Sequence, residues 1–316
     1  MMKKVLFVAV LLLTVSLPFF TGPYFLSVFN TIFVFMSLAL TWDMMLRTGQ
    51  LSYGTSGLFG LGAYASAILV ARAGFNPLVS IALGGLFAGV TAFLLGFAVL
   101  RLRKIYFSIT TLALTTVFSV VIRNLPKLTG GASGTVLPSA LFNGDPAANY
   151  WMIFGLTLGI IAISAWLSRS KTHYAINAIR NDEITARSSG IDVFRYLLLM
   201  FVITSTLQGV IGAFYVQQYA FVQPEATFSM NFLLLPLAMA LVGGVYSTIG
   251  PVVGAVLLGL ASEYLKLIMP YGHLIVYGVI IVLVVLFMPQ GITRPIMKWL
   301  TRKTNVGGVN SASIGN

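Results

Sequence analysis

Long apolar runs follow one another along almost the whole chain, and they restrict it to a fold that crosses a membrane several times. A bilayer has a hydrocarbon core about 30 Å thick, so a spanning helix needs about 20 apolar residues and must bond its backbone polar groups internally. Ten runs approach this length: 5–20, 25–42, 54–71, 77–100, 105–122, 150–167, 197–219, 232–246, 249–268 and 274–288. The mean hydropathy of +0.95 agrees with that class. We predict an all-α polytopic membrane protein with about ten helices, and at least eight.

Basic residues alternate between the two sides of such a membrane domain. With the N-terminus and C-terminus inside, 15 of the 19 Lys and Arg residues fall on inner segments, as the positive-inside rule requires. Only Arg72, Arg123, Lys127 and Lys266 remain for the outer side. The net charge of +12 therefore indicates topology and contact with anionic lipid, and nucleic acid need not be invoked.

The ends and two of the runs are less regular. The first run follows a Lys pair like a secretory signal, but Pro18, Phe19 and Phe20 replace the small residues that cleavage requires, so we expect a retained helix. We expect one transmembrane domain over 1–299 and a disordered cytoplasmic tail over 300–316. The third run is rich in glycine and the eighth is short, so either one fits a broken or re-entrant helix.

The residues that metal binding, ATP hydrolysis and serine proteolysis need are absent from the sequence or poorly placed in it. The chain has no cysteine, and its two histidines, His173 and His273, fall on opposite sides, so we predict no metal site. No phosphate-binding loop of the GxxxxGK[ST] type occurs. Residues 131–134 match the short Gly-x-Ser-Gly pattern of intramembrane serine proteases, but Ser133 would have only His273 as a base on its side, so proteolysis is a remote alternative.

Small and polar residues within the spans allow two interpretations. Gly57 and Gly60 belong to a glycine series that favours tight helix packing, and that also fits the lining of a solute path. Residues 47–56 form a polar break at the start of the third run, and their hydroxyl and amide groups could contact solute. Two glutamines of the seventh run could do the same. Our candidates for the translocation pathway are Gln50, Ser52, Thr55, Gly57, Gly60, Gln208 and Gln217. Interhelical hydrogen bonding is an equally good role for the polar members. Glu263 is the one deep carboxylate expected, and Lys266, three positions later, predicts an interfacial ion pair with it.

Residues 168–195 are the most charged part of the chain, with 8 of its 26 charged residues in 28 positions. Thr172 and Asn181 are plausible N-caps, and Gly190 before Ile191 is a common helix stop. We predict one or two short helices outside the membrane, whose apolar positions Ala175, Ile176 and Ile179 would dock in a groove of a partner. A solvated loop helix without a partner is the alternative.

Five motifs then carry a resemblance to a known family. They are residues 48–54 (TGQLSYG) with 59–64 (FGLGAY), 100–107 (LRLRKIYF), 128–131 (LTGG), 178–183 (AIRNDE) with Ala186 and Gly190, and 243–251 (GGVYSTIGP) with 254–255. In these motifs the chain resembles LivM-type permease subunits of bacterial ATP-binding-cassette importers for branched-chain amino acids, over about residues 25–288.

The resemblance implies a coupling loop over 168–196 that sits in a cleft of an ATPase subunit. The residues implied for it are Ala178, Arg180, Asp182, Glu183, Ala186, Arg187 and Gly190. It also implies a second permease subunit (LivH-like), two ATP-binding subunits (LivG/LivF-like) and a periplasmic amino acid binding protein. The chain itself would bind no cofactor, because the partner subunits would use the ATP, and it would reside in the bacterial cytoplasmic (inner) membrane.

One departure bears on the substrate. The family often has His or Gln after the motif of residues 50–54, where this chain has Thr55 and Ser56. Urea, amides or another amino acid are therefore alternatives to leucine, isoleucine and valine. An ion-coupled secondary transporter is the alternative from another class, although so few buried carboxylates do not favour it.

Overall fold

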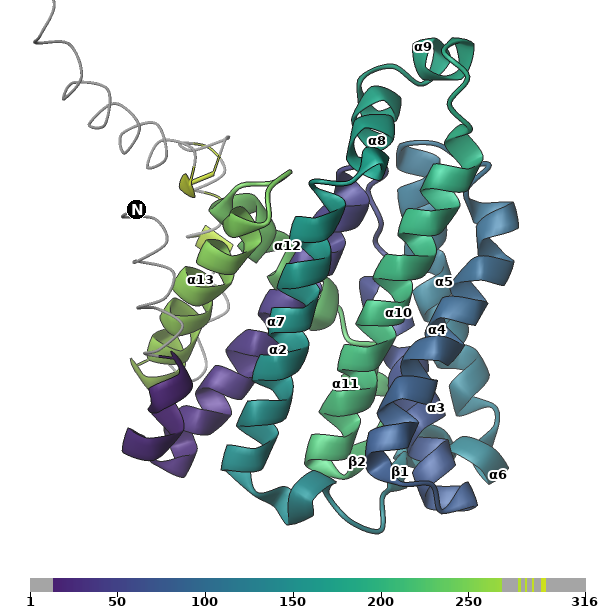
Figure 1. Ribbon diagram of the computed structural model, residues 1–316. Helices are drawn as coiled ribbons and strands as arrows, with labels where there is room; N and C mark the ends of the chain where they lie inside the picture. The colour runs from purple at the N-terminus through teal and green to yellow at the C-terminus, as the bar shows by residue number, and fades with distance from the viewer. Residues whose placement is uncertain (1–13, 269–277, 280–281, 283–285, 287–290, 294–316) are drawn as a thin grey trace, which may run out of the picture.

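The computed structural model describes residues 14–268 together with 278–279, 282, 286 and 291–293 (Figure 1). Within them, eight helical segments are long and apolar enough to cross a membrane, each on one of the predicted runs from the second to the ninth. They are α2 (Pro23–Leu46), α3 (Thr55–Ala73), α4 (Pro77–Val99), α5 (Ile105–Arg123), α7 (Pro146–Leu167), α10 (Val193–Tyr219), α11–α12 (Pro224–Gly243) and α13 (Ile249–Ile268). The all-α membrane fold is confirmed.

Parts of the prediction fall outside this description. The first run is described only over residues 14–20, which are helical. Most of the tenth run, His273 and the tail over 300–316 lie outside the described residues.

Local sequence signals explain where the long helices begin and end. Pro23, Pro77 and Pro146 each occupy the first turn, where the missing N–H costs no hydrogen bond. The side chains of Asn76 and Asp145 accept hydrogen bonds from backbone N–H groups of α4 and α7. These caps fix the helix starts at one end of the bundle.

The two irregular runs have different outcomes. The third forms α3, an unbroken helix of 19 residues. The eighth is divided: α11 (Pro224–Thr227) is separated by a short break from α12 (Asn231–Gly243), which carries Pro236 in its interior. The broken element is therefore the eighth and not the third.

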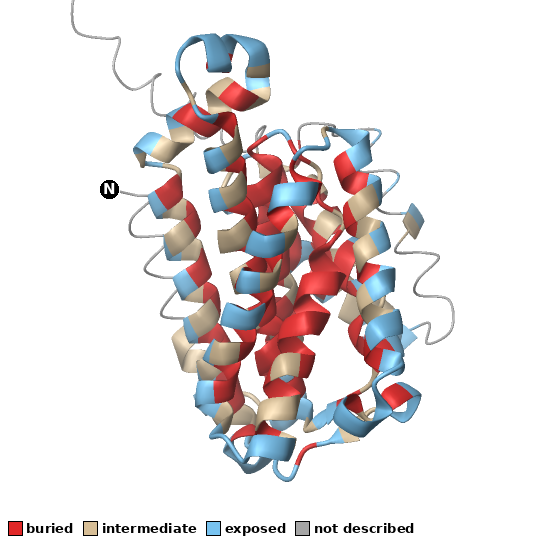
Figure 2. Cartoon of the chain, turned by 90° about the vertical axis from the view of Figure 1, so that its right-hand side faces the viewer, coloured by how far each residue is buried: buried red, intermediate tan, exposed pale blue. Residues whose placement is uncertain are grey.

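Helix α10 occupies the middle of the bundle and packs against α2, α3 and α4. Glycine allows the close approach of these helices, because a Cβ on Gly62 would lie 2.2 Å from the carbonyl oxygen of Gly209, and one on Gly212 would lie 2.0 Å from that of Phe59. Buried residues concentrate along α2, α3 and α10, whereas α4, α5 and α13 expose apolar faces (Figure 2). Packing therefore accounts for most of the glycine series, including Gly57 against Thr115 and Gly60 against Phe228.

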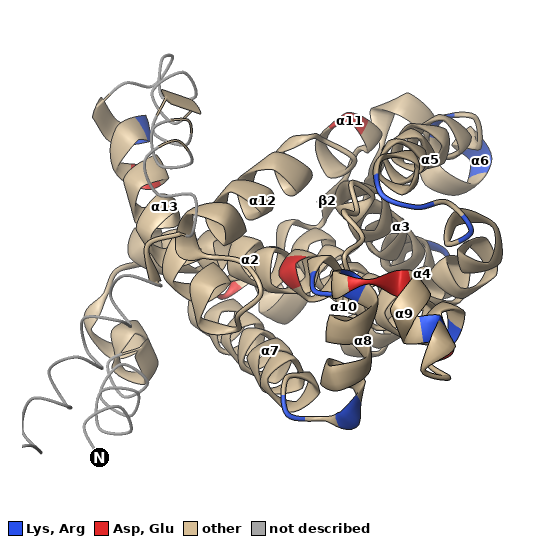
Figure 3. Ribbon diagram, turned by 90° about the horizontal axis from the view of Figure 1, so that it is seen from above, with Lys and Arg blue, Asp and Glu red and all other residues tan. Residues whose placement is uncertain are grey.

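Seen from above, the charged residues lie mainly in the loops and at the ends of the helices (Figure 3). At one end Arg103 pairs with Glu183 at 2.9 Å, joining the loop after α4 to α9. At the other end Arg72 donates to the carbonyl of Lys127, and Arg123 pairs with Glu225 at 2.8 Å. The basic residues expected inside and those expected outside are thus separated in space.

Short elements close the second end. They are α6 (Pro126–Thr129), η1 (Gly131–Ser133), β1 (Thr135–Val136), η2 (Leu141–Gly144) and β2 (Phe221–Val222). β1 and β2 pair antiparallel, with Thr135 opposite Val222 and Val136 opposite Phe221. The Gly-x-Ser-Gly residues lie in this loop, where Gly130, Gly131 and Gly134 take positive φ angles and Gly134 packs against the Val222 backbone. The glycines therefore have a conformational role, and Ser133 is exposed.

Candidate functional site: the α8–α9 segment and the ion pair beneath it

The charged segment between α7 and α10 forms two short helices, α8 (Lys171–Asn181) and α9 (Glu183–Ser188), at one end of the bundle (Figure 1). The prediction of one or two short helices is confirmed, with two present, but the predicted caps are wrong. Ser170 and Asp182 are the N-cap residues, because Asn181 still belongs to α8 while the extended Asp182 accepts from the N–H groups of Ile184 and Thr185. Gly190 ends the pair with φ +81°, as expected.

The apolar face of α8 is turned toward its own membrane domain. Ala175, Ile176 and Ile179 are 7%, 1% and 5% exposed. The two isoleucines join a core cluster with residues of α2, α4 and α10. The expectation that they dock in a partner is therefore wrong: amphipathic spacing identifies a face that is buried, but it does not identify the surface that buries it.

Other apolar side chains of this segment are exposed instead. Tyr174 on α8 and Ile184 on α9 are 74% and 78% exposed, and α9 lies at the far tip of the molecule (Figure 1). Sequence spacing gave no reason to select them, because Tyr174 falls outside the apolar stripe of Ala175, Ile176 and Ile179, and Ile184 lies between the polar residues Glu183 and Thr185.

The residues proposed for the coupling loop divide into three structural groups. Glu183 accepts from Arg103 and from Arg187, holding α9 on the loop that follows α4. Ala186 is the buried residue of α9, whereas Asp182, Arg187 and Gly190 are exposed. Ala178 is half-buried on α8, and Arg180 lies with its guanidinium 4.4 Å from the ring centre of Tyr246 in the α12–α13 loop.

A buried ion pair lies beneath this segment and was missed in the sequence. Asp43 and Arg47, at the end of α2, have side chains that are 0% and 4% exposed, and their closest approach is 2.8 Å. Arg47 donates to Asp43 through both Nε and Nη2. Asp43 is thus a more deeply buried carboxylate than Glu263, which pairs with Lys266 at 2.5 Å as predicted but has a side chain 20% exposed. The spacing of four residues between an acid and a base was the signal that could have identified the pair.

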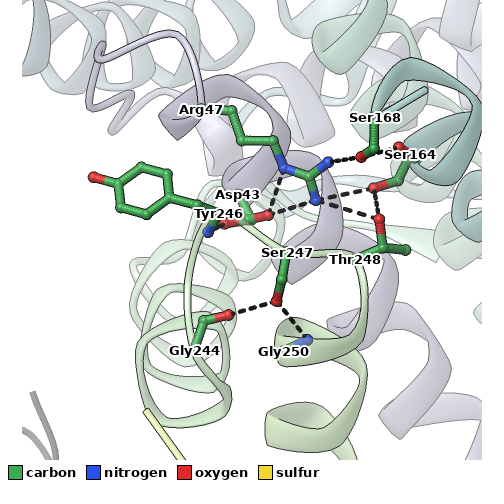
Figure 4. Close-up of polar contacts among 9 residues, drawn as sticks. All are labelled: Asp43, Arg47, Ser164, Ser168, Gly244, Tyr246, Ser247, Thr248 and Gly250. Carbon is green, nitrogen blue, oxygen red and sulfur yellow. Dashed lines mark hydrogen bonds and ion pairs between the residues drawn. The ribbon is translucent and has the colours of Figure 1, made fainter. Parts of the chain in front are cut away.

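The pair joins three segments that are distant in the chain (Figure 4). The Arg47 guanidinium donates to Ser168 at 2.7 Å and to Ser164 at 3.1 Å, both at the end of α7, and reaches Thr248 at 3.5 Å. The second oxygen of Asp43 accepts from the backbone N–H of Tyr246 at 2.6 Å. Because Tyr246 has φ +62°, this bond stabilises a backbone conformation that non-glycine residues seldom adopt.

Helix α8 packs against the residues around the Asp43–Arg47 pair. Gly49 takes φ +84°, and a Cβ there would lie 3.3 Å from the Cα of Arg180. The loop after α2 therefore lies directly against α8, while Arg180 covers Tyr246. One buried guanidinium and one stacked arginine connect α2, α7, α8 and the α12–α13 loop.

Two titratable groups outside the spans have altered affinities for protons. Burial, with the positive charges of Arg47 and Arg180, lowers the pKa of His173, whose Nε2 lies 2.8 Å from the amide nitrogen of Asn177. Hydrogen bonds from Thr185 and Ile184 lower the pKa of Asp182. Asp182 is therefore charged at neutral pH at the start of α9, where the helix dipole favours an anion.

The pathway candidates of the α2–α3 connection lie near this end and are buried. Gln50 accepts from the backbone N–H of Lys104, and the Ser52 hydroxyl accepts from the N–H of Gly54. Thr55 is 1% exposed and its hydroxyl has no partner among the described residues. Gly57 and Gly60 follow on α3 against Thr115 and Phe228.

The two glutamines of α10 lie elsewhere. Gln208 is within 3.4 Å of Thr41 on α2, and Gln217 donates to Ser66 at 2.9 Å and to Ser80 at 3.1 Å, bridging α3 and α4. The seven candidates therefore do not converge on one cavity of the described structure, and the glutamines make interhelical hydrogen bonds.

Comparison with known proteins agrees with this architecture. A family model described as "Branched-chain amino acid transport system / permease component" matches residues 24–285. The chain is 29% identical to the high-affinity branched-chain amino acid transport system permease protein LivM of Escherichia coli strain K12, over 94% of this chain and 77% of that protein. It is 26% identical to the LivH permease protein of the same system and strain, over 77% of this chain and 85% of that protein. No solved structure matches the chain.

Proposed function

Because this chain belongs to the family of permease components of branched-chain amino acid transport systems, we propose that it is the transmembrane subunit of an ATP-binding-cassette importer in the bacterial cytoplasmic membrane. Its eight described spans would supply half of a translocation pathway for leucine, isoleucine or valine. The named relatives LivM and LivH, both from one strain, support pairing with a second, similar permease. A periplasmic binding protein would deliver the amino acid.

The energy would come from two separate ATP-binding subunits. The chain has no phosphate-binding loop of the GxxxxGK[ST] type, so we assign it a transport role without ATP hydrolysis of its own. No cofactor is proposed for this chain.

The exposed tip of the α8–α9 segment is the observation that carries the assignment of a coupling role. An isoleucine that stays 78% exposed outside the bilayer forgoes about 1.5–3 kcal/mol of burial, which contact with a partner surface would supply. Ile184 and Tyr174 would enter a cleft of the ATP-binding subunit. Ala175, Ile176 and Ile179 would hold the segment on the membrane domain, so that the two parts move together.

The buried ion pair would carry this movement further. Arg180 rests on Tyr246, and Asp43 and Arg47 bind the α12–α13 loop to the ends of α2 and α7. A displacement of α8 would therefore be applied to several helix ends at once, as rigid-element coupling requires.

Co-purification tests this assignment. The tagged chain is expressed with the products of its neighbouring genes, and recovery of an ATP-hydrolysing subunit is expected from the wild type and lost with Ile184→Asp. Ser188→Asp, which places the same charge on another exposed residue of α9, is the matched control and should keep the subunit. A chain that purifies alone and still transports after reconstitution, with uptake abolished by a protonophore, would replace the importer by a secondary carrier.

A further inference from the structure

A cavity of about 430 Å³ opens on the side of the bundle opposite the coupling segment, between α2, the end of α10, α11, α12 and α13. Its volume falls within the about 300–1,000 Å³ of small-molecule sites. None of the seven pathway candidates lines it. It is therefore a feature that the sequence motifs did not reveal.

The inner wall of the cavity is apolar and rigid. Phe35 stacks on Phe232 with ring centres 5.7 Å apart, and Tyr215 meets Phe232 edge to face at 5.2 Å. Ile32 and Met239 complete the wall and are 3% and 2% exposed. Such a wall suits a branched aliphatic side chain, which packs against aromatic faces without a polar partner.

The rim of the cavity is polar and carries both signs of charge. Glu263 and Lys266 of α13 lie on it, together with Gln218, Ser229, Asn231 and Ser262. The ion pair uses one carboxylate oxygen, Glu263 Oε1, and one of the three N–H donors of Lys266. The second oxygen and the other donors have no partner among the described residues and are available to a ligand. Polar groups in a membrane domain face protein or water rather than lipid, so this rim indicates a water-filled mouth.

Glu263 lies five residues before the end of α13, which places it about 8 Å from that end of the helix. A solute arriving from the outer side would meet this rim before any buried part of the bundle. The charged rim lies at the mouth and the apolar wall lies deeper. This arrangement suits an amino acid whose charged groups stay at the mouth while its aliphatic side chain packs against the wall.

Resting on the proposed function, we propose that this cavity is the entry site for the amino acid. Lys266 would hold its carboxylate, Glu263 its ammonium group, and the wall of Phe35, Tyr215 and Phe232 its branched side chain. The ligand class is a zwitterionic α-amino acid with an aliphatic side chain, and binding involves no covalent step.

Photolabelling tests this site. The complete importer in phospholipid vesicles is irradiated with a leucine analogue that carries a diazirine in its side chain, and labelled peptides are mapped by mass spectrometry. Label is expected on α12 and α13, removed by excess leucine, and reduced at least tenfold in Glu263→Gln with Lys266→Gln. The control is Glu225→Gln with Arg123→Gln, which removes an exposed ion pair at the same end and should leave labelling unchanged.

A second pair of variants tests the apolar wall. Leu235 lines the cavity, whereas Leu234, next to it on α12, is 54% exposed outside it. Leu235→Ala should raise labelling by a diazirine analogue of phenylalanine relative to the leucine analogue several-fold, and Leu234→Ala should not.

The outcomes separate this site from the proposed function. If the wild-type importer takes up leucine but the label lies elsewhere, or survives excess leucine, the cavity is not the entry site and the importer assignment stands. A phospholipid that occupies the cavity and prevents labelling would overturn the site in the same way. If the assembled importer takes up no branched-chain amino acid, the proposed function itself fails.

Discussion

At the scale of single residues, the Asp43–Arg47 pair has the clearest energetic consequence. Both charges are buried, so removing one partner leaves the other uncompensated. Arg47→Ala should lower the free energy of unfolding by about 3–5 kcal/mol. The double variant Asp43→Leu with Arg47→Met, which replaces both charges by apolar groups, should lose much less. Denaturant unfolding in detergent measures the difference.

An exposed pair provides the comparison. Arg195 and Asp192 also lie 2.8 Å apart, but their side chains are 85% and 49% exposed. Arg195→Ala should change stability by no more than about 1 kcal/mol. Equal losses for Arg47→Ala and Arg195→Ala would contradict the role assigned to burial.

His173 predicts a dependence of stability on pH. Its folded pKa is lowered, so between that value and the unfolded value of about 6.5 the unfolded state binds more protons. Stability therefore rises with pH in this window, and it is lost as the pH falls below about 6.5. His173→Gln should flatten the melting temperature between pH 7.5 and 5.5. Asp182 does not interfere, because its contribution is lost only below the ordinary carboxyl range. An unchanged slope in the variant would exclude His173 as its source.

The sequence predicted how few charged residues lie inside the membrane better than it predicted which of them are buried. Composition and hydropathy predicted that charges inside the membrane are few, and the Glu263–Lys266 pair followed from spacing. The second apolar run was predicted to end at residue 42, directly before Asp43, so hydropathy did not indicate that Asp43 is buried. Its burial depends on Ser164, Ser168 and the backbone of Tyr246, which are contributed by segments more than 100 residues away. No local pattern contains that information.

At the scale of elements, the end of α9 depends on the backbone of Gly190. This residue takes φ +81° and has no atom within 4 Å of an added Cβ, so only its conformation restricts substitution. Asparagine tolerates this region and proline is fixed near −65°. Gly190→Asn should keep most leucine uptake, whereas Gly190→Pro should abolish it at equal protein level. Equal uptake by both variants would remove this turn from the coupling mechanism.

The contact between α9 and the loop after α4 can be tested by exchanging charges. Glu183→Lys would face Arg103 and Arg187 and should release α9, with loss of the ATP-binding subunit and of uptake. Adding Arg103→Glu restores a pair of opposite charge and should recover a substantial part of both. Failure of the double variant, with normal insertion, would mean that Glu183 contacts the partner directly and is not needed to hold α9.

Elements as such were predictable, because hydropathy and proline positions mark the spans. What the sequence could not decide was their contacts. The apolar stripe of α8 fitted a partner groove as well as the membrane domain, and only the position of α2, α4 and α10 shows that the domain itself buries it. The short length of the eighth run indicated that it could be broken. The position of the gap between α11 and α12 depends on how the chain turns beside α3.

At the scale of the whole molecule, α12 and α13 form a V whose closed end lies at the coupling side. A Cβ on Gly243 would lie 1.8 Å from the carbonyl oxygen of Gly250, and one on Gly254 would lie 1.9 Å from that of Met239, so the two helices touch there backbone to backbone. The cavity separates them toward their other ends. Tyr246 lies in the loop at the vertex, held by Asp43 and covered by Arg180. Movement of α8 would thus change the opening of the cavity.

This geometry predicts a distance change that spin labels can measure. Met230 and Leu267 lie near the open ends of α12 and α13 and are 53% and 65% exposed, and the chain has no native cysteine to compete for labels placed there. In the complete importer, trapping ATP should shift the distance between the labels by about 5 Å, the scale of one helical turn. Tyr246→Ala removes the contact with Arg180 and should abolish the shift, while Tyr106→Ala, at an exposed position of α5, should leave it intact. A full shift in Tyr246→Ala would mean that the signal reaches the cavity by another route, most directly through Arg47 and the end of α7.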